Sequence, residues 1–330
     1  MAPSPTVAAI VPHWNRRDLL AALLGNLAAQ HRPFDEIIVV DNGSTDGSAD
    51  VARERGARVI QLEHNLGFAA AVNRGVEASR SDWIGIVNND VTLAPDWLEV
   101  LLCAASRDDV WFATGKILSA QNPAILDGAF DEVSRGACAA RCGAGKPDAA
   151  IWNQPRNIRC APMTAALFRS RLFQLVGNLD EVFGSYMEDA EFGLRCALGD
   201  YAGAYVPTAV AYHQGSATLG RWSADSVRRI SRNQVLLAVK HFTGQPRLPI
   251  LIGQVLWGLV ALRHGCGWAF LRGKIAGWKE RRRFGPSDAS TNGGKRLRAI
   301  LEAGENKIIE LGRQTGLDSY WRAYFWLLPR

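Results

Sequence analysis

The chain has 330 residues, of which 48% are hydrophobic, enough for one large globular domain or for a domain with an appendage. Residues 1–220 hold 18 Lys and Arg against 25 Asp and Glu, whereas residues 221–330 hold 20 against 7. A net charge of −7 is therefore followed by one of +13, which predicts an acidic part and a basic part that meets an anionic partner. No recognisable nucleic-acid-binding motif accompanies the positive charge, so we exclude nucleic acid as that partner.

The cysteines and the first residues indicate a reducing compartment. Six cysteines are scattered along the chain, and Cys138 and Cys142 lack the second pair that a zinc finger requires. Residues 1–6 carry no basic segment followed by an apolar one, so they do not resemble a secretory leader. We therefore expect reduced thiols and a cytoplasmic protein.

Strands and helices alternate over the first ninety residues. Apolar runs predict strands at 7–12, 36–40, 58–61 and 83–87. Apolar residues at helical spacing predict helices at 16–30, 48–55 and 66–78. This alternation is typical of an α/β fold with a doubly wound, mostly parallel sheet.

The pattern is less regular after residue 90. We expect three further strands, at 113–118, 165–168 and 205–212, and a helix at 189–198. The segment 123–155 is rich in Gly, Ala and Asp and is expected to form a loop or hairpin region. From residue 223 onward the periodicity predicts helices, so the α/β part is followed by a helical C-terminal extension.

Polar residues follow three of the predicted strands at the points where the strands end. The three groups are Pro12 to Asn15, Asp41, and Asn88-Asn89-Asp90. Because parallel strands end at the same edge of a sheet, these groups can share a pocket. A carboxylate with amide neighbours suits a hard divalent cation that also holds phosphates. The alternative is that Asn-Asn-Asp is ordinary turn chemistry.

Four motifs within residues 6–216 carry a resemblance to a known family. They are the segment 37–47 around Asp41-Asn42-Gly43-Ser44, the segment 65–75 that begins Asn65-Leu66-Gly67-Phe68, Asn88-Asn89-Asp90, and Glu188-Asp189. On these motifs the chain resembles the family 2 glycosyltransferases of the GT-A fold. With Asn-Asn-Asp in place of Asp-x-Asp, it looks most like the rhamnosyltransferase-like branch, and galactofuranosyltransferases are near relatives.

The resemblance implies a division of the chain. Residues 1–220 would form the GT-A catalytic domain, with a nucleotide-sugar half at about 1–118 and an acceptor half at about 119–220. Residues 221–330 would form a basic, Trp-rich helical region.

The resemblance also implies how a nucleotide-sugar donor, linked to dTDP or UDP, binds at the strand ends. Asp41 would accept a hydrogen bond from the ring N–H of uracil or thymine, and Pro12 and Asn15 would wall the base and ribose. Gly67 would let the backbone approach the ligand closely. Asn73 would donate a hydrogen bond to ribose or phosphate.

The diphosphate would lie against Asn89 and Asp90. The resemblance implies that Asp90 binds Mg²⁺ or Mn²⁺, with His213 as a second protein ligand, and that the metal neutralises charge on the departing nucleoside diphosphate. Asn88 stands where Asp-x-Asp has its first carboxylate, so the site loses a charge. We therefore expect weaker metal binding, with Asp90 as the principal anionic ligand.

Glu188 and Asp189 supply the acid pair that the family uses in catalysis. The resemblance implies that Asp189 is the general base, because the family's base is usually the second acid, and that Glu188 orients the acceptor. A single base opposite the leaving group implies inversion at the anomeric carbon. The alternative is that both acids are there because the first turn of a helix favours negative charge.

The C-terminal region combines apolar and cationic residues. The apolar stretch 248–262 is shorter than the ~20 residues that span a bilayer. After it, Trp268 and Trp278 are interleaved with Arg and Lys, which suits an interfacial helix on an anionic membrane. This interpretation places the protein peripherally on the inner face of the plasma membrane. Packing within the protein, with a solvated basic rim, is the alternative, and a homodimer stays open.

These expectations combine into an inverting, metal-dependent transfer of rhamnose from dTDP-rhamnose to a hydroxyl of a polysaccharide or lipid-linked glycan precursor. A UDP-sugar transferase of the same fold, for galactofuranose, glucose or GlcNAc, is the alternative within the class. A sugar nucleotidyltransferase would need a Gly-rich phosphate loop with a basic residue where the chain has Pro12-His13-Trp14-Asn15. A non-catalytic GT-A-like binding module is the alternative of another class.

Overall fold

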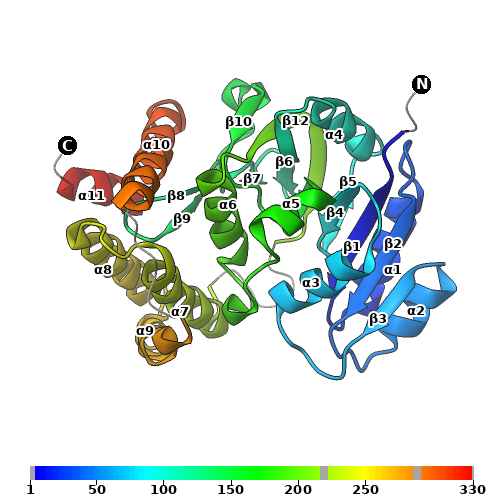
Figure 1. Ribbon diagram of the computed structural model, residues 1–330, viewed down its shortest axis with the longest axis horizontal. Coiled ribbons are helices and arrows are strands. Elements are labelled where there is room, and N and C mark those ends of the chain that lie inside the picture. Colours follow the sequence, from blue (N-terminus) through cyan, green and yellow to red (C-terminus); the bar gives the residue numbers. More distant parts are fainter. Residues whose placement is uncertain (1–3, 216–221, 285–290, 329–330) are drawn as a thin grey trace. The chain divides into compact units, whose positions relative to one another are not determined.

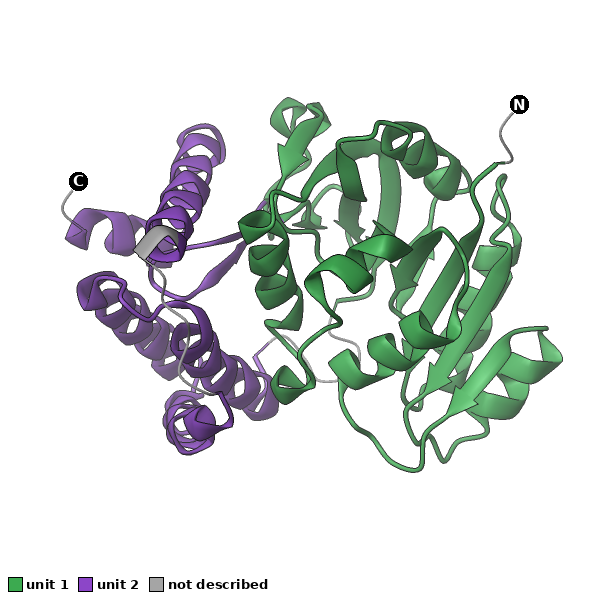
Figure 2. Ribbon diagram, in the orientation of Figure 1, with its two compact units in different colours: residues 1–130, 143–215 green, residues 131–142, 216–330 purple. Residues whose placement is uncertain are grey.

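The chain divides into two compact units (Figure 2). The computed structural model describes residues 4–215, 222–284 and 291–328. The first unit comprises residues 1–130 and 143–215, and the second comprises residues 131–142 and 216–330. The chain therefore leaves the first unit after Phe130, contributes a short segment to the second, and returns at Gly143.

A mixed sheet is the centre of the first unit (Figure 1). Its strands are β1 Val7–His13, β2 Glu36–Asp41, β3 Arg58–Gln61, β4 Trp83–Val87, β5 Val91–Leu93, β6 Val110–Ser119, β7 Leu126–Gly128, β10 Arg156–Ile158, β11 Ala165–Arg169 and β12 Ala202–His213. Their main order is β10-β12-β6-β11-β4-β1-β2-β3. The strands β3-β2-β1-β4 are parallel, as are β6 and β12, whereas β11 runs antiparallel between β4 and β6. Every strand predicted from an apolar run is confirmed.

Helices cover the sheet through apolar or small residues. They are α1 Arg17–Ala28, α2 Ser48–Glu54, α3 Phe68–Ala78, α4 Trp97–Ala105, α5 Ser170–Val176 and α6 Glu188–Leu198, with short 3-10 turns η1 Ala150–Asn153 and η2 Glu181–Phe183. The buried leucines of α1 and Trp97 of α4 join one apolar core with inward residues of β1, β2 and β4. α3 packs closely on β1, since a Cβ on Gly75 would lie 2.4 Å from a methyl carbon of Ile10. The helices α4 and α5 are not predicted from the sequence.

The segment 123–155 contains a hairpin, which is one of the two forms expected for it. It holds β7 and η1, and it also holds β8 Asp131–Val133 and β9 Ala139–Arg141, which pair antiparallel as a separate hairpin. The hairpin belongs to the second unit and not to the sheet.

The second unit is helical apart from this hairpin. Its helices are α7 Ala224–His241, α8 Arg247–Arg263, α9 Gly267–Glu280, α10 Thr291–Thr315 and α11 Ser319–Leu327, with a 3-10 turn η3 Arg281–Arg283. Buried Cys138 and Ala140 of the hairpin share an apolar core with Trp321 and Tyr324 of α11. The hairpin is therefore an integral part of this unit.

We expect reduced cysteines and an apolar stretch, 248–262, that is too short to span a bilayer. All six cysteines lie in the described part of the chain, and none of them forms a disulfide there. Within the residues that the structure describes, no helix has both the length and the apolar character needed to cross a membrane.

Candidate active site

The carboxyl ends of β1, β2 and β4 lie at one edge of the sheet. His13 and Asp41 are register partners at the ends of β1 and β2. Asn88 directly follows β4, and its backbone N–H donates to the carbonyl of Thr164 just before β11. The predicted groups around Asp41 and Asn88-Asn89-Asp90 are therefore brought to the same edge, as the parallel strands require.

Asp41 is a fully buried carboxylate with one oxygen in use. Its Oδ1 accepts a hydrogen bond from the backbone N–H of Ser44 at 3.0 Å. Its Oδ2 is buried and has no hydrogen-bond partner in the described part of the chain. Because an unsatisfied buried acceptor is costly, this oxygen is suited to receive an N–H from a ligand.

The turn after β1 is held against the turn after β2. Asn15 donates its backbone N–H to Ser44 Oγ at 2.7 Å, and its Oδ1 accepts from the N–H of Thr45 at 3.1 Å. Asn15 and Arg16 have φ of +53° and +65°, which residues other than glycine rarely adopt. Pro12 is buried opposite Val40. Both predicted wall residues thus lie beside the Asp41 turn.

His13 is a site residue that the sequence does not single out. It is 2% exposed, its Nδ1 lies 2.8 Å from Asn89 Nδ2, and its Nε2 has no hydrogen-bond partner among the described residues. Burial lowers the pKa of His13 to about 4, against the opposing charges of Asp41 and Asp46, so the ring is neutral at pH 7. With Nδ1 accepting from Asn89, the proton lies on Nε2, which is an unused donor.

Gly67 has a positive φ that favours glycine, and the group that lies close to it is the backbone of Gly184. Its φ is +95°, and a Cβ there would lie 3.0 Å from the backbone of Gly184. The N–H of Ala69 donates to the carbonyl of Gly184 at 2.8 Å. Asn42 fixes the same loop by donating to Gly67 O and accepting from Leu66 N. The loop thus connects the end of β2 with the segment before α6.

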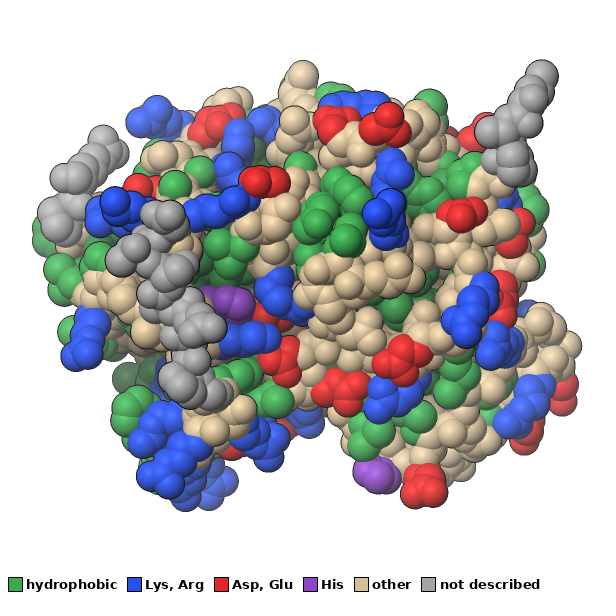
Figure 3. Space-filling model, viewed as in Figure 1, with side chains coloured by type: hydrophobic (Ala, Val, Ile, Leu, Met, Phe, Trp, Pro, Cys, Tyr) green, Lys and Arg blue, Asp and Glu red, His purple; other side chains and the backbone are tan. Residues whose placement is uncertain are grey.

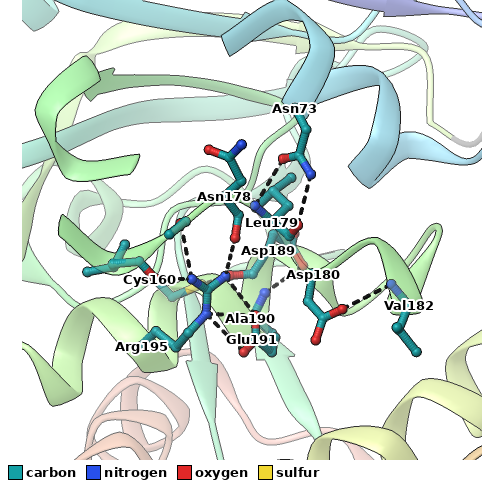
Figure 4. A network of polar contacts seen from close by, with 12 residues as sticks. Asn73, Cys160, Asn178, Leu179, Asp180, Val182, Asp189, Ala190, Glu191 and Arg195 are labelled. Carbon is teal, nitrogen blue, oxygen red and sulfur yellow. Dashed lines mark hydrogen bonds and ion pairs between the residues drawn. The ribbon is translucent and has the colours of Figure 1, made fainter. Parts of the chain in front are cut away.

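Asn73 performs a similar connecting role (Figure 4). Its Nδ2 donates to Leu179 O at 2.9 Å and to Glu181 Oε1 at 3.0 Å, and its Oδ1 accepts from Leu179 N at 3.0 Å. The side chain is 3% exposed. A direct hydrogen bond from Asn73 to ribose or phosphate would have to break these contacts, so its position favours holding α3 against the segment that leads to α6.

Asp90 and His213 are brought together, and a third residue joins them. β5, which follows Asp90, pairs with the end of β12, and His213 Nε2 lies 3.3 Å from Asp90 Oδ1. His213 Nδ1 lies 2.9 Å from Oδ2 of Asp127 on β7. Burial lowers the pKa of His213, but hydrogen bonds and charge from Asp127 and Asp90 outweigh this effect and raise it to about 9. Asp127 is not predicted from the sequence.

The donor set at this point fits a hard divalent cation. Asp90 supplies a carboxylate, His213 Nε2 faces it, and Asn88 Oδ1 is buried without a hydrogen-bond partner in the described ranges. Asp127 on the other ring nitrogen is the kind of partner that orients a ligating histidine. No group of three or more His, Cys, Asp or Glu side chains within the described residues is arranged to hold a metal. Further ligands would therefore have to be diphosphate oxygens and water, as is usual for Mg²⁺.

The acid pair lies at the start of α6, after an unusual turn. Tyr186 and Met187 have φ of +72° and +69°, and such outliers are found often at functional sites. Glu188 is buried, whereas Asp189 is partly exposed and its Oδ1 accepts from the N–H of Ala190 at 2.8 Å. The Sγ of Cys160 lies 3.4 Å from the carbonyl oxygen of Asp189.

Glu191, the third acid of this turn, is structural (Figure 4). It is fully buried, and both its carboxylate oxygens lie 3.0 Å from the Nε of Arg195. Arg195 also donates to the carbonyl of Asn178 at 2.8 Å. These bonds hold α6 to the preceding loop, and they leave Asp189 as the acid of this turn that is partly open to solvent.

Comparison with known proteins identifies the site-bearing part of the chain. Residues 8–129 match the family model described as Glycosyl transferase family 2. This part of the chain belongs to glycosyltransferase family 2. The matched range contains the ends of β1, β2 and β4 and therefore most of the residues predicted to bind a donor.

Two relatives of this chain, both from bacteria, are glycosyltransferases by their names. An N-acetylglucosaminyl-diphospho-decaprenol L-rhamnosyltransferase of Mycobacterium tuberculosis is 29% identical over 276 residues, covering 76% of this chain and 87% of that protein. A putative teichuronic acid biosynthesis glycosyltransferase of Bacillus subtilis is 31% identical over 129 residues, covering 37% of this chain and 51% of that protein.

Solved structures show the fold of the glycosyltransferase. A mannosyltransferase from Pyrobaculum calidifontis, in complex with GDP-Man and Mn²⁺, has a TM-score of 0.55 at 17% identity, covering 98% of this chain and 87% of that one. GalNAc-T7 with UDP, GalNAc and Mn²⁺ has a TM-score of 0.65 at 12% identity, covering 96% of this chain and 59% of that one. The GT-A fold expected from the sequence is confirmed.

Proposed function

We propose that this glycosyltransferase transfers rhamnose from dTDP-rhamnose, with inversion, to a hydroxyl of a lipid-linked glycan precursor. One observation carries the proposal. Two buried side-chain atoms without hydrogen-bond partners among the described residues lie at the same edge of the sheet as a set of side chains suited to bind a divalent cation. The unused groups are Asp41 Oδ2 and His13 Nε2, and the donor set is Asp90, His213 and Asn88.

The unused groups favour uracil or thymine as the donor base. The imide edge of these bases has one N–H with a carbonyl on each side, so it needs one acceptor and a neighbouring donor. Asp41 Oδ2 is the acceptor, and the neutral His13 Nε2–H is the donor. Guanine would present two adjacent N–H groups to the carboxylate, but Asp41 Oδ1 already accepts from Ser44. This difference supports a dTDP- or UDP-linked sugar over a GDP-linked one.

Asp90, His213 and Asn88 are the residues that would hold a divalent cation at the diphosphate. When bound, Mg²⁺ or Mn²⁺ supplies Lewis-acid neutralisation of charge on the leaving nucleoside diphosphate. Asp127 holds the imidazole of His213 in place through Nδ1. The side-chain amide of Asn89 donates a hydrogen bond to His13 Nδ1. Asn89 would therefore link the base-binding end of the site to the diphosphate end.

Asp189 takes the role of the general base. As the acceptor oxygen attacks the anomeric carbon, the bond from this carbon to the diphosphate oxygen breaks, and Asp189 takes the hydroxyl proton. The N–H of Ala190 fixes Oδ1 at the first turn of α6. A positioned base contributes typically ~10²–10⁴-fold to the rate. Glu188 lies next to it in the chain and would orient the acceptor.

The named activity of the mycobacterial relative supports both the sugar and the acceptor. That protein is an L-rhamnosyltransferase whose name gives a diphospho-decaprenol-linked N-acetylglucosamine. The present chain covers 87% of its length, so the similarity extends beyond the donor half. A UDP-linked galactofuranose, glucose or GlcNAc stays the alternative, because Asp41 and His13 do not distinguish uracil from thymine.

The proposal is tested by titrating the protein with dTDP, UDP and GDP in Mn²⁺ and then assaying transfer from the corresponding sugar nucleotides. We expect dTDP or UDP to bind at least tenfold more tightly than GDP. His13→Phe should reduce this preference while the fold is kept. Asp189→Asn should keep donor binding and lose ~10²–10⁴-fold in kcat.

Other outcomes would reject parts of the proposal. Full activity of Asp189→Asn would show that it is not the base. Preferred binding of GDP would reject the assignment of the base-binding groups. Nucleotide binding without transfer or hydrolysis from any tested donor would favour a non-catalytic binding module.

A further inference from the structure

The helices α8 and α9 expose their large apolar side chains. Five on α8 are 52–65% exposed and follow helical spacing, namely Leu248, Leu251, Val255, Leu259 and Leu262. Four on α9 are 49–65% exposed and follow the same spacing, namely Trp268, Leu271, Ile275 and Trp278. We call these nine residues the apolar face. Each helix therefore carries an exposed apolar stripe, and apolar surface of this kind marks an interaction site.

The inner sides of the same helices carry small residues. On α9, a Cβ at Gly273 would lie 2.3 Å from Arg228 O and one at Gly277 would lie 2.6 Å from Arg232 O, so this side packs directly on the backbone of α7. Ala261 of α8 and Ala269 of α9 are buried in one cluster with Val227 of α7. An ordinary surface helix does the reverse, burying its large apolar residues. The apolar face is therefore built to contact something outside the unit.

Cationic side chains surround the apolar face. Between residues 247 and 283 the chain has eight Lys and Arg, of which Lys274 is buried, and a single acid, Glu280. Glu280 is held by Arg232 at 3.0 Å from Nε, so it does not offset the exposed cations. Arg247 and Arg263 lie at the two ends of α8, and Arg281–Arg283 directly follow α9. Lys and Arg side chains gather near α9 on the face shown in Figure 3.

The two tryptophans of the apolar face each lie against an arginine side chain. The guanidinium of Arg272 lies 5.4 Å from the ring of Trp268, and that of Arg281 lies 4.0 Å from the ring of Trp278. Tryptophan beside arginine suits the boundary between acyl chains and headgroups, where the ring is half-buried and the cation meets phosphate.

We propose that α8 and α9 form a docking surface for an anionic phospholipid bilayer, on which both helices lie flat. The apolar face would enter the headgroup and acyl boundary, and the surrounding Arg and Lys would contact lipid phosphates. Charge decides between a bilayer and a second copy of the chain. Joining two copies through this face would bring their cationic rims together, and juxtaposed like charges oppose association.

The proposal is tested on the full chain by co-sedimentation with vesicles of phosphatidylcholine, with and without 30% phosphatidylglycerol. We expect binding to the anionic vesicles and weakening by 0.5 M NaCl. Leu259→Gln should weaken binding about tenfold, whereas Leu175→Gln, an exposed leucine on α5, should leave it unchanged. The triple variant L251Q/V255Q/L259Q should abolish detectable binding.

Charge is tested separately with two variants of equal net charge. R272Q/R282Q/R283Q should weaken binding to anionic vesicles about 100-fold, at roughly fivefold for each cation near the surface. K295Q/R298Q/R313Q, with the same charge removed from α10, should weaken it much less. Equal weakening by both would show non-specific attraction and overturn the docking surface.

Two further results would overturn the proposal, and neither depends on catalysis. One is equal vesicle binding by wild type and L251Q/V255Q/L259Q, with circular dichroism showing both folded. The other is a wild-type dimer, measured by light scattering, that L251Q/V255Q/L259Q converts to monomer, which would make the face a contact between copies. Vesicle binding needs no donor or turnover, so failure of the proposed transfer activity leaves this test intact.

Discussion

The Nδ1 of His213 lies 2.9 Å from Oδ2 of Asp127, although 86 residues separate them in the chain. This contact fixes the imidazole so that Nε2 faces Asp90. We predict that Asp127→Asn raises the Mn²⁺ concentration needed for half-maximal activity by about 10–100-fold, because partners of this kind orient a ligating histidine. Titration of activity with Mn²⁺ measures the effect, and addition of EDTA should abolish activity in both proteins.

A matched control distinguishes this role from a general loss of charge. Asp109→Asn removes an exposed carboxylate that pairs with a surface arginine, Arg107, at 2.6 Å. It should leave the Mn²⁺ requirement unchanged. If Asp127→Asn also left it unchanged, Asp127 would not act through His213.

The same cluster predicts how stability depends on pH without metal. Its carboxylates raise the pKa of His213 to about 9 from 6.5, so the protonated ring is favoured in the folded state. The stabilisation is fully present below pH 6.5 and is lost as the pH rises through 9, where the folded protein also gives up the proton. It amounts to on the order of 3 kcal/mol. Melting curves in EDTA from pH 6 to 9.5 should show the stability difference between wild type and His213→Gln shrinking as the pH rises from 6.5 to 9.

Gly67 is predicted to tolerate no side chain. Its φ of +95° and the 3.0 Å approach to Gly184 mean that Gly67→Ala requires both strain and a backbone shift. We expect a loss of about 2–3 kcal/mol in the free energy of unfolding. Gly25→Ala in α1 is the control, since its Cβ would lie no closer than 3.7 Å to a neighbour and alanine favours a helix. Urea denaturation should show a clear loss in the free energy of unfolding for Gly67→Ala and little change or a small gain for Gly25→Ala.

Buried Lys274 in the second unit predicts a different pH dependence. Its Nζ donates to Gln234 Oε1 at 2.8 Å and also to Gln254, and burial lowers its pKa to about 7 from 10.5. Between pH 7 and 10.5 the unfolded chain binds more protons at this site, so the contribution of Lys274 to stability rises with pH there and is constant below 7. Lys274→Met should therefore remove a burial penalty of on the order of 4 kcal/mol at pH 7 and of about 1 kcal/mol at pH 10.

The diagnostic quantity for Lys274 is the slope with pH. Losing the lysine also leaves two glutamine oxygens without their donor, which affects all pH values alike. Lys279→Met, at an exposed position of α9, should show no such slope. A constant difference between Lys274→Met and wild type from pH 7 to 10 would contradict the prediction.

Local patterns predict the N-terminal half of the fold because each strand there is an apolar run bounded by turns. The predicted bounds of β3 and β4 coincide with Arg58–Gln61 and Trp83–Val87. The hairpin β8-β9 has three-residue strands, and Asp131 and Glu132 are buried in it. Asp131 is compensated by Arg141 at 3.3 Å, so an acidic strand is buried through an ion pair that no apolar pattern records.

Sequence patterns likewise predict only some of the residues of the candidate site. Asp41, Asp90 and Asp189 belong to motifs and can be chosen from the sequence as candidates. Asp127 and His13 cannot, because their significance lies in partners that only the folded chain supplies. His13 becomes informative through burial and an unused nitrogen, and both depend on the neighbouring strands. The predicted catalytic roles of these residues are tested by the variants described above.

The segment 131–142 has a consequence for how the protein is made. Gly136 lies so close to Gly253 and Tyr324 that a Cβ would reach within 2.9 Å of Tyr324, and Arg135 Nη2 pairs with Glu305 at 2.7 Å. Its partners on α10 and α11 are translated roughly 10–40 s later, at ~5–20 residues per second. A nascent chain therefore carries this hairpin without its partners on α10 and α11 until those helices have been synthesised. Residues 131–142 can therefore reach their final packing only after α10 and α11 have left the ribosome.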